Sequence, residues 1–371
     1  MIYLDNAATT KPSPEAVAAA EHAMTVCWGN PSASYKPGRD AKSLLEAARA
    51  SVARALGGKT EEVIFTSGGT EADNQALIGA ATKQRHRGRH IISSLTEHEA
   101  VLETLKYLKA EGYDVTLLPP EKDGAVSLSA VEEALREDTI LISLMLVNNE
   151  TGAINPVIQV SSMLKDRGSI ALLHVDAVQA FKKIPFSIRT LGADLVTISA
   201  HKIHGIKGAG ALWVKNGVKL NPFIYGGGQE GGSRSGTEAG PAIAAFGAAA
   251  SIEFNKNYAS LRQILVNELP EAVFIGEGTA AHINCLALPG CKAEVLASYL
   301  DSIGICVSRG SACAKGRRSH VLTAMGLKPE IIDAALRVSF SEYTTEEEVY
   351  TFCTELKKAR DRFFPAKGRR K

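Results

Sequence analysis

Short apolar runs alternate with amphipathic stretches over residues 60–215, and this alternation constrains the fold more than any other feature of the sequence. Each run is almost unbroken in its apolar character, as expected for strands that are covered on both faces. The expected strands are Val63–Thr66, His90–Ser93, Val115–Leu118, Ile140–Leu144, Ala171–Val175, Leu195–Ile198 and Ala211–Val214. We therefore predict an α/β fold with a mainly parallel central sheet and helices on both faces. Ligands of such sheets bind at the carboxyl ends of the strands.

Helical patterns fill the segments between these runs. Ser43–Leu56 places its apolar residues near one face, and Ser129–Glu132 has the spacing of a capping box at a helix start. Residues from about 260 onward indicate a smaller α/β lobe, and the first residues are too few to fold alone. A chain of 371 residues can form two lobes. We predict a large domain over residues 15–255 and a small domain over residues 1–14 and 256–371.

Composition argues against several classes of protein. The 42 Lys and Arg residues against 40 Asp and Glu residues give a net charge of +2, so no overall field favours nucleic acid or membrane. No apolar stretch has the length of a membrane span, and Met1–Asp5 does not begin a secretion signal. The six cysteines are scattered without metal-binding spacing, which favours reduced thiols. We expect a cytoplasmic protein without a metal site, a membrane partner or direct contact with nucleic acid.

Two charged side chains follow neighbouring expected strands. Lys202 comes just after Leu195–Ile198, and Asp176 comes directly after Ala171–Val175. A lysine at a strand end can form a Schiff base with an aldehyde cofactor. A buried carboxylate can pair with a pyridinium nitrogen and keep it protonated, which makes the ring an electron sink. Lys202 alone could be a surface lysine and Asp176 alone a turn residue, but together they favour pyridoxal 5'-phosphate (PLP).

Other strand ends carry groups that suit the same cofactor. Gly69 and Thr70 lie between the strand at 63–66 and a helix, where free backbone N–H groups and the helix dipole attract a phosphate. His98 follows the strand at 90–93 and could stack on a flat ring and transfer protons. Asn149 and Gln179 could donate to the phenolic oxygen of the ring. Each of these residues taken singly could also be a cap or a surface polar group.

Motifs along nearly the whole chain resemble the cysteine desulfurases of the NifS/IscS type, within the fold-type I PLP enzymes (class V aminotransferase family). The resemblance implies the fold of a PLP-dependent transferase with an aspartate aminotransferase-like architecture. The matching segments are Tyr3–Thr10, Gly29–Ser32, Phe65–Glu71, Thr96–His98, Val147–Gly152, His174–Gln179, Ser199–Lys202, Gly226–Glu230, Arg234–Thr237, Gly310–Cys313 and Leu336–Ser339.

The resemblance implies a role for each cofactor residue at a matching position. Lys202 would be the Schiff-base lysine, Asp176 the partner of the ring nitrogen, and His98 the residue stacked on the ring. The remaining contacts would come from Asn149 and Gln179 at the phenolic oxygen, from Gly69, Thr70, Ser199 and His201 at the phosphate, and from Thr237 at the phosphate of the other subunit. The family is thus expected to form a homodimer with shared active sites.

The resemblance also implies how substrate and sulfur are handled. Arg337 would bind the carboxylate of L-cysteine, a task that suits a guanidinium, and Asn30 and Arg234 would help to position the substrate. Cys313 lies in a loop of small and basic residues that favours a reactive thiolate. It would receive the sulfur as a persulfide, while L-alanine is released. The sulfur would then pass to an acceptor protein, either an iron–sulfur scaffold or a tRNA-thiolating enzyme.

Some residues depart from the family pattern, and other functions stay open. Tyr35 stands where the family usually has histidine, and Ile206 stands where the family has proline. The loop that contains Cys313 is about two residues shorter than the same loop in the longest-loop members of the family. An aminotransferase of the same fold would use Lys202 and Arg337 but would give Cys313 no role. Selenocysteine lyase activity and a mainly partner-binding sulfur carrier are further alternatives.

Overall fold

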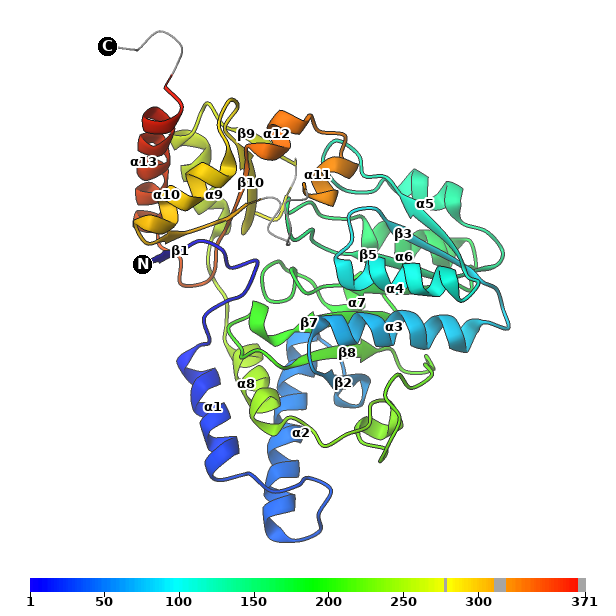
Figure 1. Ribbon diagram of the computed structural model, residues 1–371. Coiled ribbons are helices and arrows are strands. Elements are labelled where there is room, and N and C mark those ends of the chain that lie inside the picture. Colours follow the sequence, from blue (N-terminus) through cyan, green and yellow to red (C-terminus); the bar gives the residue numbers. More distant parts are fainter. Residues whose placement is uncertain (277–278, 310–317, 366–371) are drawn as a thin grey trace.

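The apolar runs predicted as strands form one seven-stranded sheet, with the order β2-β8-β7-β6-β5-β3-β4. The protein is described here from a computed structural model that covers residues 1–276, 279–309 and 318–365 (Figure 1). The strands are β2 Val63–Thr66, β3 His90–Ser94, β4 Asp114–Leu118, β5 Thr139–Met145, β6 Leu172–Asp176, β7 Leu195–Ser199 and β8 Gly210–Val214. The pairings from β7 to β4 are parallel, whereas β8 is antiparallel to both β2 and β7. The predicted fold class is confirmed.

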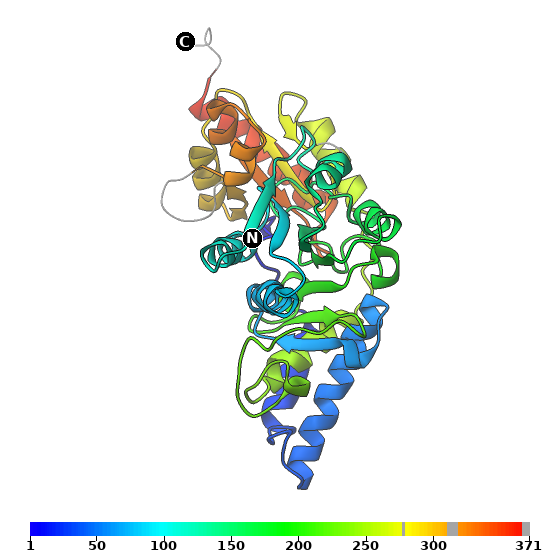
Figure 2. The same cartoon turned by 90° about the vertical axis from the view of Figure 1, so that its right-hand side faces the viewer.

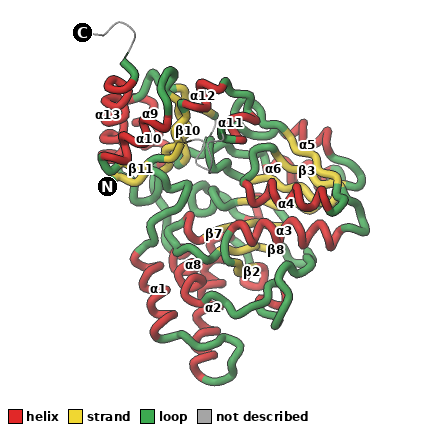
Figure 3. The backbone as a smooth tube through the Cα atoms, viewed as in Figure 1, coloured by secondary structure: helices red, strands yellow, loops and turns green. Residues whose placement is uncertain are grey.

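Helices cover both faces of this sheet (Figure 3). On one face, α3 Gly69–Gln84 and α4 Glu99–Ala110 share a hydrophobic cluster with apolar side chains of β3, β5, β7 and β8. A larger cluster on the other face contains residues from α1 Pro14–Thr25, α2 Lys36–Leu56, α5 Leu128–Ala134, α6 Val157–Asp166, α7 Ile188–Leu191 and α8 Gly240–Ser251. Three short 3-10 turns, η1 Thr60–Glu62, η2 Ala200–Lys202 and η3 Glu230–Gly232, join these elements.

The start of α5 corrects one local prediction. The helix does not begin with a capping box at Ser129, because Ser127 is its N-cap. Ser127 has an extended backbone, and its hydroxyl accepts a hydrogen bond from the N–H of Ala130 at 3.2 Å. Because the helix begins at Leu128, Ser129 is its second residue and lies inside the first turn, so it is not the N-cap.

A second lobe is built on a four-stranded antiparallel sheet with the order β12-β13-β10-β9. Its strands are β9 Val273–Ile275, β10 Ile283–Ala287, β12 Ser308–Arg309 and β13 Ala335–Ser339, and a parallel pair joins β1 Ile2–Tyr3 to β11 Ile305–Cys306. Its helices are α9 Tyr258–Glu268, α10 Ala293–Ser302, α11 His320–Ala324, α12 Pro329–Asp333 and α13 Glu346–Phe363. This lobe has its own apolar core, to which Leu4 belongs. No helix in the described ranges is long and apolar enough to cross a membrane.

The N-terminal segment runs from the small lobe to the large one and crosses the carboxyl edge of the large sheet. The N–H of Leu4 donates a hydrogen bond to the carbonyl of Cys306 in the small lobe, whereas the hydroxyl of Thr10 donates to the carbonyl of His201 in the large lobe. The small lobe also contacts the backbone of Asn149 and Gln179, which follow β5 and β6. The ends of these strands therefore lie next to both the small lobe and the N-terminal segment.

Candidate active site

Lys202 lies in the 3-10 turn after β7, at the edge of the sheet that faces the small lobe. Its ammonium group donates to the backbone carbonyls of Ala7 at 2.6 Å and Ala8 at 2.8 Å. Burial and then the positive charge of Arg337 lower the pKa of Lys202 to about 8, although the carboxylates of Asp176 and Asp5 act in the opposite direction. The site therefore favours an amine that loses its proton more easily than an ordinary lysine.

Asp176 is the last residue of the neighbouring strand β6, and its carboxyl group is buried. One carboxyl oxygen accepts a hydrogen bond from the N–H of Val178 at 2.9 Å. Burial raises the pKa of Asp176, and this hydrogen bond, together with the nearby His98 and Lys202, opposes the increase. A cationic ring nitrogen placed here would stabilise the carboxylate further, because a buried anion gains most from a direct counter-ion.

His98 is the N-cap of α4, and its Nδ1 accepts a hydrogen bond from the N–H of Ala100 at 3.1 Å. In the neutral ring the proton is therefore on Nε2. Burial lowers the pKa of His98, whereas Asp176 raises it. Together with Thr70, His98 lines a cavity of about 830 Å³ that extends between α3 and α4. The histidine is thus placed beside Asp176 and Lys202 while one side of it remains open.

The turn before α3 fits a phosphate group. Gly68 caps α3 without a side-chain hydrogen bond, and a Cβ added to Gly69 would lie 3.0 Å from Val178 Cγ2 and 3.7 Å from Ser199 Cβ. Ser199 Oγ is buried and lacks a hydrogen-bond partner among the residues that the structure describes. A helix N-terminus beside an uncommitted hydroxyl is a suitable site for an anion. His201 is next to it but uses Nδ1 to contact Thr9 Oγ1 at 3.1 Å.

Two carboxamides complete the match to PLP. Gln179 donates from Nε2 to the carbonyl of Ala7 at 2.9 Å. The Oε1 atom of Gln179 and the Oδ1 atom of Asn149 are buried and have no hydrogen-bond partner within the described ranges. Both uncommitted atoms are oxygens, which accept hydrogen bonds, so they suit a ring hydroxyl that donates one. Together with Lys202, Asp176 and the phosphate turn, these residues fit PLP.

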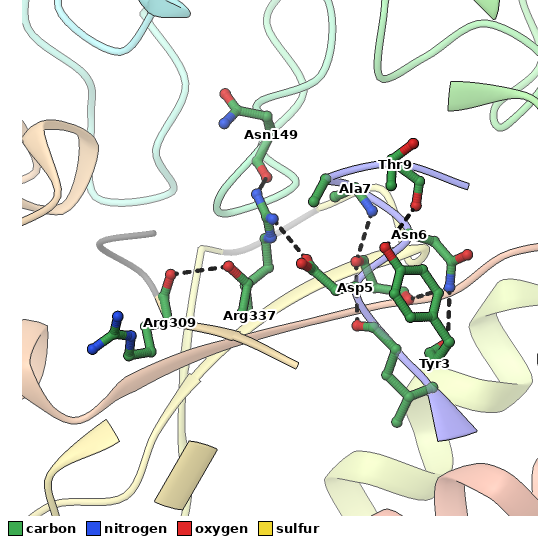
Figure 4. A network of polar contacts seen from close by, with 12 residues as sticks. Tyr3, Asp5, Asn6, Ala7, Thr9, Asn149, Arg309 and Arg337 are labelled. Carbon is green, nitrogen blue, oxygen red and sulfur yellow. Dashed lines mark hydrogen bonds and ion pairs between the residues drawn. The ribbon is translucent and has the colours of Figure 1, made fainter. Parts of the chain in front are cut away.

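Arg337 reaches this site from β13 of the small lobe, and its side chain is only 8% exposed. Its Nη1 donates to the carbonyl of Asn149 at 2.8 Å, and its Nη2 donates to Asp5 Oδ1 at 2.8 Å (Figure 4). Its third nitrogen, Nε, is buried and finds no hydrogen-bond partner in the described part of the chain. The guanidinium is therefore held in place but still has donors for a ligand.

The structure does not gather all the predicted residues around Lys202. Asn30 lies in the loop between α1 and α2, at the end of the molecule opposite the small lobe (Figure 2). The 21 residues of α2 span about 30 Å, and the loop lies at the end of this helix that is remote from η1 and β2. Arg234 is paired with Glu71 at 2.8 Å, beside the phosphate turn, and Thr237 is exposed before α8. Neither contacts Lys202 in the part of the chain that is described, and Cys313 lies outside the described residues.

The other cysteines differ in their surroundings. Cys285, Cys291 and Cys353 are buried, and burial raises the pKa of the Cys285 and Cys353 thiols to about 12. Cys27 and Cys306 are partly exposed. A thiol with a raised pKa is a poor nucleophile at neutral pH, so the buried pair is unsuited to receiving sulfur.

Several residues of the site were missed by sequence reasoning. Asp5, Ala7 and Ala8 supply acceptors to Arg337 and Lys202, although the motif Tyr3–Thr10 was noted only as part of the resemblance. Asp73 is also buried, with its Oδ1 at 3.6 Å from His174 Nε2, and burial and the charge of Asp176 raise its pKa. The sequence signal for Asp73 is an acidic residue between alanines near the start of α3.

Comparisons with known proteins agree with this geometry. Residues 2–352 match the family described as aminotransferase class-V. The chain is 40% identical to a cysteine desulfurase IscS of Methanosarcina thermophila, over 94% of this chain and 89% of that protein. It is 39% identical to a putative cysteine desulfurase IscS 1 of Bacillus subtilis, over 94% and 96% of the two chains.

Solved structures lead to the same family. A NifS-like protein superimposes with a TM-score of 0.91 at 37% identity, covering 96% of this chain and 98% of the other. The structure titled SspA in complex with cysteine gives a TM-score of 0.84 at 31% identity, covering 93% and 100%. The chain belongs to the class V aminotransferase family and, within it, to the cysteine desulfurases of the NifS/IscS type. The resemblance that the motifs predict and the enzyme class that it implies are confirmed at the level of the family.

We expect covalent uptake of an aldehyde by Lys202 to increase with pH up to about 8 and then to level off. The reason is that the pKa of Lys202 is lowered to about 8, so the neutral amine becomes dominant above that pH. The cofactor-free protein would be mixed with pyridoxal from about pH 6 to about pH 11, a range that includes the ordinary lysine pKa of about 10.4. Borohydride trapping and mass spectrometry of the Lys202 peptide measure the rate, with a short lysine peptide as control. Uptake that climbs in parallel with the control would contradict the expectation.

Proposed function

We propose that the protein is a PLP-dependent cysteine desulfurase. Its overall reaction converts L-cysteine and the Cys313 thiol into L-alanine and a persulfide on Cys313, so one sulfur atom moves and no external oxidant or reductant is needed. The observation that carries the proposal is that Lys202, whose pKa is lowered to about 8, and the buried Asp176 lie at the ends of adjacent strands. The family to which the chain belongs supports the same activity.

Each residue of the cofactor site has a task in this proposal. Lys202 would hold the cofactor covalently and, once released, would accept the proton from the α-carbon of the substrate. Asp176 would stay charged against the ring nitrogen, and the bound cofactor would supply an electron sink. His98 would stack on the ring and return a proton from Nε2. The phosphate would be held by Gly69, Thr70, Ser199 and His201, and the phenolic oxygen by Asn149 and Gln179.

Arg337 would orient the substrate by its carboxylate, because it is buried, fixed by two hydrogen bonds and still has free donors. Arg234 and Asn30 are proposed as further positioning residues. Since Asn30 lies far from Lys202 of its own chain, a contribution from it would have to be made to the site of a second subunit. The sulfur on Cys313 would be delivered to an acceptor protein, either an iron–sulfur scaffold or a tRNA-thiolating enzyme, in the cytoplasm.

A homodimer with shared sites is part of the same proposal. Thr237 is exposed, and Phe223 and Tyr225 are exposed at 37% and 79% next to the cavity that Thr70 and His98 line. Large exposed aromatic side chains beside a cavity are typical of a protein–protein contact. A second subunit seated there would bring its Thr237 to the phosphate turn and would close the open side of His98.

The test is the release of alanine from L-cysteine without any added keto acid. We expect stoichiometric alanine in one turnover without reductant, and mass spectrometry of the Cys313 peptide should then show the added mass of one sulfur atom. With a reducing thiol present, turnover should become continuous. The Cys313→Ser variant should lose sulfide production, whereas Cys27→Ser, which changes a partly exposed thiol between α1 and α2, should retain it.

Three outcomes would contradict the proposal. Alanine formed only when a keto acid is added would indicate an aminotransferase. Full sulfide production by Cys313→Ser would remove the sulfur-accepting role. A much higher rate with selenocysteine that does not depend on Cys313 would indicate a selenocysteine lyase.

A further inference from the structure

The N-terminal segment supplies a carboxylate to the same guanidinium that is proposed to bind the substrate. Asp5 Oδ1 accepts a hydrogen bond from Arg337 Nη2 at 2.8 Å (Figure 4). The Asp5 and Arg337 side chains are 21% and 8% exposed. The pair is thus largely shielded from water, where an ion pair is screened less than at a surface. Neither the motifs nor the family resemblance gave Asp5 a role.

The backbone holds Asp5 firmly in this position. Asp5 forms a parallel bridge with Ser339, which lies two residues after Arg337 on β13. Asn6 Nδ2 donates to the carbonyl of Ser339 at 2.9 Å, and the N–H of Ala7 donates to Ser339 Oγ at 2.8 Å. Asp5 and Arg337 are therefore fixed to the same strand, and their contact does not depend on how the lobes are arranged.

The position of Asp5 on the guanidinium matters for substrate binding, because Asp5 is hydrogen-bonded to Nη2 of Arg337. A guanidinium binds a carboxylate with two parallel N–H bonds either at its end, through Nη1 and Nη2, or at its side, through Nε and Nη2. Nη2 belongs to both edges. Since Arg337 Nη2 already donates to Asp5, an incoming α-carboxylate must share that nitrogen with Asp5 or displace it, and two negative groups then lie side by side.

We propose that Asp5 is a built-in competitor for Arg337, which weakens the binding of α-carboxylates and so limits how tightly L-cysteine and L-alanine are held. This proposal rests on the proposed role of Arg337. Competition from Asp5 would help the enzyme to release alanine. Alanine retains the amino and carboxylate groups of the substrate, so without this competition it would be held as strongly as L-cysteine. Asp5 is thus a residue that sets affinity through Arg337, not a group that reacts.

The charges around Lys202 provide a second consequence. Arg337 lowers the pKa of Lys202 and Asp5 raises it, so the pair partly cancels at the amine. Without the charge of Asp5, the positive charge of Arg337 is no longer compensated, and the pKa of Lys202 should fall below about 8. This effect can be measured in the cofactor-free protein and does not depend on turnover.

The experiment compares the binding of L-alanine to the holoenzyme and to its Asp5→Asn variant by calorimetry. Asparagine keeps an oxygen that can accept from Nη2 but removes the charge, so we expect alanine to bind about tenfold tighter, an effect of the size expected for two carboxylates a few ångströms apart. Asp5→Ser should also bind alanine more tightly. The matched control is Asp194→Asn, which removes a carboxylate paired with Lys215 at 2.9 Å outside the site and should leave alanine affinity unchanged.

The readouts separate this inference from the proposed function. If Arg337→Ala binds alanine as well as the wild type does, the carboxylate-binding role of Arg337 is wrong. If Arg337→Ala weakens binding but Asp5→Asn and Asp5→Ser fail to tighten it, only the role of Asp5 is overturned. The double variant Asp5→Asn with Arg337→Ala should show no gain over Arg337→Ala. In cofactor-free Asp5→Asn, the pH profile of pyridoxal uptake should move to lower pH, and an unchanged profile would also count against the proposal.

Discussion

Replacing Lys202 with alanine should abolish desulfurase activity and allow the cofactor to be lost on gel filtration. The side chain is proposed to hold the cofactor and to move the α-proton, and loss of a positioned acid–base group alone typically costs about 10²–10⁴-fold in rate. Its position at the end of β7, its contacts with Ala7 and Ala8 and a pKa lowered to about 8 all support these two tasks. Alanine release and the visible absorbance of the eluted protein measure the two losses separately.

A second buried lysine, Lys183, offers an alternative anchor for the cofactor against which this prediction can be tested. Burial and then the charge of Lys202 lower the pKa of Lys183 to about 7, so Lys183 is also a plausible nucleophile by its pKa. Borohydride reduction of the holoenzyme followed by peptide mapping identifies the lysine that carries the cofactor. We expect the label on Lys202 and none on Lys183. A wild-type protein labelled at Lys183, or a Lys202→Ala variant that keeps its colour and its activity, would show that the anchor is misassigned. Lys215→Ala, at an exposed ion pair, is the control and should behave as the wild type.

The central sheet was readable from the sequence because burial leaves a strong pattern. Strands covered on both faces are mainly apolar, and each of the predicted runs became a strand of the large sheet, although the edge strand β4 is only partly buried. The direction of β8 was not readable. Ala211–Val214 would have the same apolar run in either orientation, and the orientation depends on pairing with β2 and β7. The cap of α5 was misplaced for a related reason, since Ser127 and Ser129 are chemically equivalent candidates and only the backbone path decides between them.

The sequence predicts the site residues that lie at or just after strand ends, but it does not predict those that come from other segments. Lys202 and Gln179 follow β7 and β6, and Asp176 ends β6, so the rule that ligands bind at the carboxyl edge finds them. Asp5 and the carbonyls of Ala7 and Ala8 come from a segment that pairs with β11 and β13, and sequence order gives no sign that it crosses this edge. Backbone carbonyls carry no sequence signal at all. Asn30 illustrates the opposite case, because a motif residue can lie far from Lys202 of its own chain.

Replacing Asp176 with asparagine should reduce kcat by roughly 10²–10³-fold while the cofactor stays bound. The change is nearly isosteric, and the amide oxygen can still accept the N–H of Val178, which is 2.9 Å from Asp176 Oδ1. What is lost is a buried negative charge that is proposed to pair with the ring nitrogen, and breaking a buried ion pair typically costs about 3–5 kcal/mol. Without this charge Asp176 would no longer keep a bound ring nitrogen protonated, and the electron sink that the cofactor supplies would be weaker.

The exchange of the α-proton of L-alanine with deuterated water isolates this effect, because it requires proton removal but no sulfur transfer. In Asp176→Asn, exchange should slow as much as kcat does, while PLP content by absorbance stays at the wild-type level. The negative charge of Asp176 raises the pKa values of both Lys202 and His98, so the pH profile of pyridoxal uptake by the cofactor-free variant should also move to lower pH. Asp194→Asn again serves as the control, since Asp194 lies just before β7 and pairs with Lys215. Exchange within about threefold of the wild type, against the 10²-fold loss expected for a broken buried pair, would mean that the ring nitrogen does not depend on Asp176.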